Sequence, residues 1–345
     1  MTVARSQLVD TDVTCWYHVI SETVRGALLL AEGDGQRKAW IENRLEELVG
    51  SFAIEVAGFT ALDTHLHALV HLSPDRAAQW SDEEVVRRWG RVVPPRGKHR
   101  EPEEMSDEWV KQKLADPTFV DTARKRLANL GWFMKLLKEP LARLANKQDG
   151  CRGAFWQSRY KSIAILDNEA LLATCAYIDL NPVAAGIAEL PEDSPYTSLH
   201  QRVEHCREKG RLADLQAARQ GTVAAARLAA ELDEDHWLCP INDTRASGGE
   251  RIGLLEGFSL GSYLQLVDWT SRLFREGKAR VSDEVAPILD RLDTTGEMWQ
   301  ETMKRLFAKA GKTLGVAFAF HRDPLRQAAA HRGCHHLANL NGCRT

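Results

Sequence analysis

Asp63-Thr64-His65-Leu66-His67-Ala68-Leu69-Val70-His71-Leu72 is the stretch of sequence that decides the fold. Its apolar residues alternate up to a final leucine, which is typical of a buried strand. Side chains at i and i+2 of a strand point to one face, so His65 and His67 project together, with His71 further along that face. Two imidazoles side by side on a rigid strand can hold a divalent metal ion. Two histidines that merely pack on a sheet would show the same pattern, so other residues must decide between the two interpretations.

Length and composition place the chain among ordinary globular proteins. Its 345 residues suggest two domains, and 44% hydrophobic with 27% charged residues allow a buried core. No apolar run is long enough to cross a bilayer and the first residues lack the apolar core of a signal peptide, so we expect a cytoplasmic protein with no membrane partner. The net charge of -3 does not by itself indicate nucleic-acid binding. None of the seven cysteines forms a Cys-x-x-Cys pair, which gives no support to a zinc ribbon.

The elements before the opening stretch indicate the fold class. The sequence predicts a strand over 14–21, a helix over 36–50 with apolar residues at helical spacing, and a second strand over 52–62. The stretch at 65–72 pairs with this second strand after a short Asp-Thr turn. Strand, helix, strand, strand forms most of a ferredoxin-like half. The predicted class is therefore α+β, a ferredoxin-like antiparallel sheet with helices on one face.

A switch in charge follows. Six cations lie between residues 87 and 100 with no acid among them, and acidic residues follow from Glu101 to Glu108. A basic arm for a phosphate backbone would have this composition. A solvated loop with self-compensating charge would have it as well.

A basic, aromatic segment lies further on. A helical tract is predicted over 118–146, with Pro140 bending or interrupting it. The segment from Gly150 to Ile165 then reads as a loop that enters a strand. Its interleaved cations and aromatic rings suit single-stranded nucleic acid, because bases stack on rings while cations hold phosphates. The alternative is that Phe155 and Trp156 belong to the core. The candidate DNA-binding residues are Arg152, Trp156, Gln157, Arg159, Tyr160 and Lys161.

The next predicted helix contains Tyr177-Ile178-Asp179-Leu180-Asn181-Pro182-Val183. It opens at Asp167-Asn168-Glu169, with Asp167 or Asn168 as the N-cap. Tyr177 and Asn181 are four residues apart and share one helical face, and Pro182 is predicted to end the helix at or just after Asn181. A tyrosine in such a place can be presented to a neighbouring sheet, or it can simply pack.

Together these motifs resemble a known family. His65-Leu66-His67 resembles the HUH motif. The segment from Phe155 to Lys161, followed by Tyr177-Ile178-x-x-Asn181-Pro182, resembles the signature of single-tyrosine HUH transposases, and above all the REP-associated tyrosine transposases. The resemblance covers residues 14–199. One departure is Asp63-Thr64, where the family usually has Pro-Asn or Ser-Asn before the first histidine.

The resemblance implies a function and a site. It implies a metal-dependent DNA transposase, a transesterase that cleaves and rejoins single-stranded or hairpin DNA through a 5′-phosphotyrosine intermediate. Tyr177 would be the catalytic nucleophile, and His65, His67 and Asn181 would hold the divalent metal ion. Magnesium favours oxygen ligands, so Mn²⁺ fits this ligand set as well as Mg²⁺ or better. The alternative is a domesticated, non-cleaving protein that binds a DNA or RNA hairpin.

The remaining sequence is less informative. We expect a catalytic domain over 1–200 and a mostly helical extension of unknown role over 201–345, in a monomer or homodimer. Helices are predicted over 212–232, 261–270 and 298–310. The cysteines and histidines near the C-terminus lack regular zinc-ligand spacing.

Overall fold

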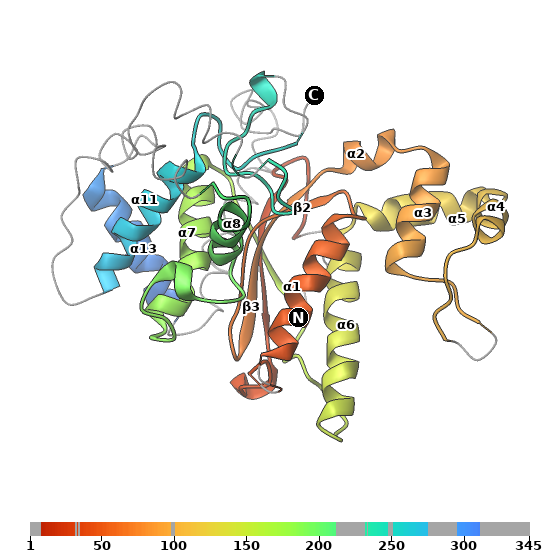
Figure 1. The fold of residues 1–345 in the computed structure, drawn as a ribbon, viewed down its shortest axis with the longest axis horizontal. Coiled ribbons are helices and arrows are strands. Elements are labelled where there is room, and N and C mark those ends of the chain that lie inside the picture. Colours follow the sequence, from red (N-terminus) through yellow and green to blue (C-terminus); the bar gives the residue numbers. More distant parts are fainter. Residues whose placement is uncertain are drawn as a thin grey trace.

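The computed structural model describes residues 8–31, 33, 35–97, 101–211, 232, 234–247, 251–274 and 295–310. The helices and strands, in chain order, are β1 (Trp16–Glu22), α1 (Gln36–Val49), β2 (Ile54–Ala61), β3 (His65–Leu72), α2 (Pro74–Gln79), α3 (Asp82–Val92), α4 (Asp107–Leu114), α5 (Pro117–Leu127), α6 (Leu130–Gln148), β4 (Lys161–Ala164), α7 (Asn168–Ala184), α8 (Ser198–Glu208), α11 (Leu260–Ser271) and α13 (Gly296–Ala310) (Figure 1). Short 3-10 turns, among them η3 (Pro191–Asp193), join some of them.

The centre of the fold is a four-stranded sheet with the order β2-β3-β1-β4. Every neighbouring pair is antiparallel. With α1 between β1 and β2, and α6 before β4, this is the ferredoxin-like topology that the sequence predicted. The α+β class with an antiparallel sheet is therefore confirmed, and β3 begins and ends at the residues expected from its alternating pattern.

Helices cover both faces of this sheet, whereas the sequence predicted them on one (Figure 1). Residues opposite one another on paired strands share a face. Val19, Ala68 and Phe59 lie on the face whose core includes buried residues of α1 and α6. Leu69, on the other face, packs in a second core with residues of α7. Helices cover this second face because α7 is buried from Leu171 to Pro182 and so must pack against an apolar surface of the sheet.

Strand β2 approaches α7 closely at a bulge. The β2–β3 register shifts between Val56 and Gly58. A Cβ atom on Gly58 would lie 3.4 Å from both Cys175 Sγ and Ser198 Oγ. A Cβ atom alone would just touch both atoms, and a larger side chain would push α7 and α8 away from the sheet, so glycine fits this close approach.

The helical tract predicted over 118–146 is two helices. Helix α5 ends at Leu127, and the Asn129 side chain caps α6 by accepting a hydrogen bond from the Trp132 amide at 3.1 Å. Pro140 does not interrupt α6. Proline has no N–H for the carbonyl four residues earlier, but Arg44 Nε donates to that Leu136 carbonyl at 3.3 Å.

Helix α7 begins as predicted and ends later. The Asp167 carboxylate caps it through the Ala170 amide at 2.7 Å. The prediction that Pro182 ends the helix near Asn181 was wrong, because α7 continues to Ala184. The Ala185 amide still donates to the Asn181 carbonyl at 2.9 Å, so the proline removes only its own bond and the last turn still closes.

Residues beyond 200 pack onto α7. Tyr263 and Trp269 of α11 and Trp299 of α13 share the core of Leu172 and Ile178. Helices α11 and α13 confirm the helices predicted over 261–270 and 298–310. The tract predicted over 212–232, apart from Leu232, and the C-terminal cysteines and histidines lie outside the described residues. In the part of the chain that is described, no helix has both the length and the apolar composition needed to cross a membrane.

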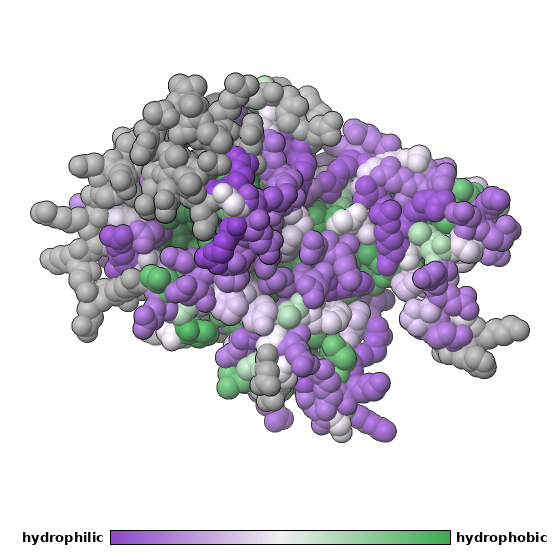
Figure 2. All heavy atoms as spheres, in the orientation of Figure 1, coloured by the Kyte–Doolittle hydropathy of each residue, from purple (hydrophilic) through white to green (hydrophobic). Residues whose placement is uncertain are grey.

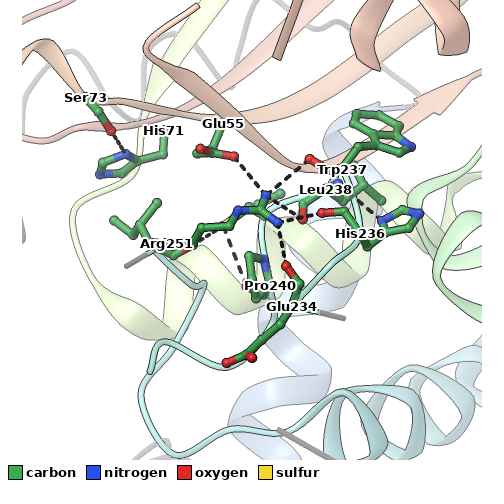
Figure 3. Close-up of polar contacts among 12 residues, drawn as sticks. Glu55, His71, Ser73, Glu234, His236, Trp237, Leu238, Pro240 and Arg251 are labelled. Carbon is green, nitrogen blue, oxygen red and sulfur yellow. Dashed lines mark hydrogen bonds and ion pairs between the residues drawn. The ribbon is translucent and has the colours of Figure 1, made fainter. Parts of the chain in front are cut away.

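Arg251 fastens the segment 234–247 to the sheet (Figure 3). Its guanidinium donates to the carbonyls of Glu234 and His236 at 2.9 and 2.6 Å, and to the buried Glu55 carboxylate on β2 at 3.2 Å. A charge-assisted bond to a buried acid is stronger than a neutral one. This contact holds an irregular segment against the end of the sheet near His71.

Candidate active site

The sheet face beneath α7 carries the polar side chains that the sequence singled out. His65 and His67 lie on β3, one of the two central strands. Across the register, Glu22 of β1 is opposite His65, and Thr60 of β2 is opposite His67. Strand β3 therefore presents both imidazoles to the helix that bears Tyr177.

His67 is fixed by a histidine that sequence reasoning missed. The His18 Nε2 atom lies 2.9 Å from His67 Nδ1, and the two rings stack with centroids 5.1 Å apart. One of these nitrogens donates and the other accepts. The remaining ring nitrogen, His67 Nε2, is buried and has no hydrogen-bond partner. A buried polar atom without a partner is costly, so this nitrogen is available to a ligand.

His65 is held in a similar way. Its Nδ1 atom lies 2.8 Å from Thr64 Oγ1, which leaves Nε2 as its other ring nitrogen. The His65 and His67 rings are 4.8 Å apart. The departure at Asp63-Thr64 leaves the turn intact, since the Leu62 amide donates to the His65 carbonyl at 2.9 Å.

Both histidines are neutral at neutral pH. Burial lowers the pKa of His65, and it lowers the pKa of His67 well below its ordinary value, with the His65 and His18 rings adding to the shift. A neutral imidazole has a free lone pair, which is the form that binds a metal ion.

Tyr177 reaches this cluster from α7. Its ring centroid lies 5.6 Å from that of His67 and 6.0 Å from that of His18. Burial raises the pKa of the phenol, and the Asn181 side chain one turn later lowers it in part. The Asn181 Nδ2 atom is also buried without a partner. Phe307 of α13 covers the Tyr177 ring at 4.9 Å, and Tyr177 is only 4% exposed.

These residues fit a divalent metal ion only as a partial ligand set. Among the described residues, no group of three or more His, Cys, Asp or Glu side chains could hold a metal. The available donors are the imidazoles of His65 and His67, of which His67 has an unpaired Nε2 atom, and the Asn181 amide, which interacts with Tyr177. Two nitrogens and an amide oxygen suit Mn²⁺ better than Mg²⁺, with water or phosphate oxygens as the remaining ligands. His71 is separate from this set, since it bonds Ser73 Oγ at 3.0 Å and packs against Trp16.

The candidate DNA-binding residues divide into two groups. Arg152, Gln157 and Arg159 are exposed. Tyr160 is buried in the core, and Trp156 is half-buried with its indole N–H donating to the Lys138 carbonyl at 3.0 Å. The buried Tyr160 ring therefore offers no free face for a base, whereas Trp156 is partly accessible.

Lys161, at the start of β4, forms an ion pair with Glu22 at 3.2 Å. Since Glu22 is opposite His65, this ion pair lies beside the histidine cluster rather than on an outer surface. Phosphate binding by Lys161 would have to compete with Glu22.

A buried carboxylate positions α7. Asp179 accepts hydrogen bonds from the Ser198 and Tyr263 hydroxyls and, at 3.0 Å, from the Leu199 amide. Ser198 Oγ in turn accepts from the Phe59 amide of β2 at 2.9 Å. The helix is thereby tied to β2, α8 and α11, two residues from Tyr177.

Comparisons with known proteins give one match. No protein-family model matches the chain, and no curated protein matches it. A solved structure of a REP-associated tyrosine transposase bound to a REP hairpin is similar, with a TM-score of 0.32 and 13% identity over 55% of this chain and 78% of that chain.

Proposed function

We propose that this chain is a metal-dependent single-strand DNA transesterase that cleaves and rejoins hairpin-forming DNA. The observation that carries the proposal is the contact of the Tyr177 ring with His67, whose Nε2 atom is buried without a partner. The motifs that resemble single-tyrosine HUH transposases support the same assignment.

In this proposal Tyr177 is the nucleophile. Its Oη atom forms a bond to the scissile phosphorus, and the bond from phosphorus to the 3′ oxygen breaks. The phenol proton is lost, and the leaving oxygen takes up a proton, giving a 5′-phosphotyrosine and a free 3′ hydroxyl. The reverse step lets another 3′ hydroxyl rejoin the strand.

The residues around Tyr177 have distinct roles. His65 and His67 would hold the metal ion, with Asn181 as a supporting ligand. Bound there, a divalent cation would withdraw charge from the phosphate oxygens. His18 fixes the orientation of His67, and Asp179 fixes the helix that carries Tyr177. The exposed Arg152, Gln157 and Arg159 would contact the DNA.

A non-cleaving hairpin-binding protein is the second candidate. It is favoured by the burial of Tyr177 under Phe307 and by the raised pKa of its phenol. A labelled hairpin oligonucleotide incubated with the protein and Mn²⁺, then run on a denaturing protein gel, separates the two. A covalent adduct supports transesterification, and a gel-mobility shift without an adduct supports binding alone.

A further inference from the structure

A groove lies on the side of the sheet away from the histidines. It runs between α1, the end of α3 and α6, with a volume of about 760 Å³, and its lining includes Trp40, Asn43, Arg44, Arg91 and Pro140. These helices belong to the core on the α1–α6 face, whereas Tyr177 belongs to the α7 core. The groove is therefore separate from the candidate active site.

Arg44 holds the groove in shape. It donates to the Leu136 carbonyl of α6 and to the Val92 carbonyl of α3, both at 3.3 Å, and pairs with Glu47 at 2.7 Å. The Leu136 carbonyl is available because Pro140 has no N–H. One side chain thus joins three helices, with its own charge balanced.

Other cations near the groove are not balanced. Trp132, Leu136 and Pro140 are spaced four residues apart on α6 and so lie on one face of the helix. Trp132 is about 12 Å from Pro140 along the helix axis. The Arg126 guanidinium lies 4.2 Å and the Lys135 ammonium 4.6 Å from the Trp132 ring centre. Arg126, Lys135 and the exposed Arg91 form no ion pair with any of the described residues.

The surrounding surface is polar, and some of its cations have acidic partners. Hydrophilic residues dominate the visible surface of the α2–α5 projection (Figure 2). Lys125 of α5 and Arg143 of α6 are each paired with an acid four residues earlier, Asp121 and Glu139. Arg91, Arg126 and Lys135 keep their charge, and two of them are pre-positioned on an indole.

We infer that this groove and the Trp132 cations form a second binding site for single-stranded nucleic acid. Cations would hold successive phosphates, two of them from positions on the Trp132 ring, while the half-buried Trp40 ring offers an edge or a face to an unpaired base. The cations could bind other polyanions as well, and the inference that the ligand is a nucleic acid rests on the proposed function. The site would hold strand that flanks the cleaved sequence, on the face opposite the catalytic one.

The test uses the full chain and a fluorescein-labelled oligothymidine that cannot form a hairpin. The variant Arg91→Gln/Arg126→Gln/Lys135→Gln is compared with the control Lys125→Gln/Arg143→Gln/Arg305→Gln, whose cations are all ion-paired. We expect the first to raise Kd at least about tenfold and to reduce the slope of log K against log salt by about 2, for three lost phosphate contacts. The control should match the wild type. Equal affinity in both variants would overturn the site.

A second measurement does not depend on folding of the variant. Wild-type protein is irradiated with an oligothymidine carrying 5-iodouracil, and crosslinked peptides are identified by mass spectrometry. Crosslinks at Trp40 or Trp132 support the site, and crosslinks only elsewhere contradict it. A proline-rich peptide that binds here while the oligothymidine does not would also overturn it.

The outcome is separable from that of the proposed function. Oligothymidine binding is measured in the Tyr177→Phe background, where no adduct is expected. If wild-type protein never forms an adduct but oligothymidine still crosslinks to the groove, only the transesterase proposal fails. If the adduct forms but the groove variants bind normally, only the groove proposal fails.

Discussion

His67 is the residue on which the account depends most. Its backbone belongs to a central strand, its Nδ1 atom is bonded to His18, and its Nε2 atom is buried without a partner. An imidazole oriented in this way resembles the metal-binding histidines whose second nitrogen is fixed by a hydrogen bond. His18 therefore matters to metal binding without touching the metal.

Replacing His18 should weaken metal binding. His18→Ala leaves His67 free to rotate and unpaired at Nδ1, so we expect Mn²⁺ affinity to fall by about 10- to 100-fold. His18→Asn, which retains a hydrogen-bonding group, should recover part of it. Titration calorimetry without DNA gives the affinities, and His71→Asn, outside the cluster, is the control. Unchanged affinity in His18→Ala would remove His18 from the site.

At the scale of elements, α7 is positioned by one buried carboxylate. Asp179 is fully buried, and its three hydrogen bonds join α8 and α11 to the helix. Burial raises the pKa of Asp179, while the hydrogen bonds from Ser198 and Tyr263 lower it in part. Without the Asp179 carboxylate, the Ser198 and Tyr263 hydroxyls and the Leu199 amide would have no hydrogen-bond acceptor here.

Asp179→Ala should therefore destabilise the protein. Three donors lose their acceptor in a buried place, and we expect a loss of about 3–5 kcal/mol in the free energy of unfolding. Tyr263→Phe, which removes one donor only, should cost about 1–2 kcal/mol. Urea unfolding measures both. Equal and small losses would mean that the network does not hold α7.

Parts of these elements were predictable from sequence and parts were not. The bounds of β3 followed from a short apolar run with histidines at every second position near its start, and the proximity of Tyr177 to the histidines agreed with the motif order. The break before α6 was missed because apolar spacing continues through Asn129, and only its capping bond reveals it. His18 was missed because it became a neighbour of His67 through the pairing of β1 with β3, which depends on topology. DNA binding by Trp156 and Tyr160 stays a prediction, and composition alone could not show that Tyr160 lies in the core while Trp156 is half-buried.

For the whole molecule, the main feature is that both sheet faces are covered. The residues beyond 200 contribute α11 and α13 to the core around α7, and Phe307 packs on Tyr177. The predicted catalytic domain over 1–200 would expose that core if it were isolated. The division into a catalytic domain and an extension at residue 200 stays a prediction.

Stability should fall in mild acid. Burial lowers the pKa of His71 and of His236 to about 3. In the unfolded chain these histidines titrate near pH 6.5, so below that pH the unfolded state binds more protons. Their contribution to the free energy of unfolding is complete above about pH 6.5 and is lost as the pH falls towards 3. By pH 5 the loss is about 2 kcal/mol for each histidine.

Urea unfolding between pH 7.5 and pH 5 checks this window, where most carboxylates stay ionised. His71→Asn should reduce the pH dependence by about one proton, or about 1.4 kcal/mol per pH unit. A free energy of unfolding that is the same at pH 7 and pH 5 in the wild type would show that these histidines are not buried as neutral groups.

The central claim is that Tyr177 forms the covalent bond to DNA. The most direct measurement is the denaturing gel with labelled hairpin oligonucleotide and Mn²⁺, run for the wild type and for Tyr177→Phe. The substitution removes only a hydroxyl, so folding and hairpin binding should be retained. We predict a covalent adduct with the wild type and none with Tyr177→Phe. An adduct that persists in the Phe variant would contradict the assignment and would make Tyr160 the next residue to replace.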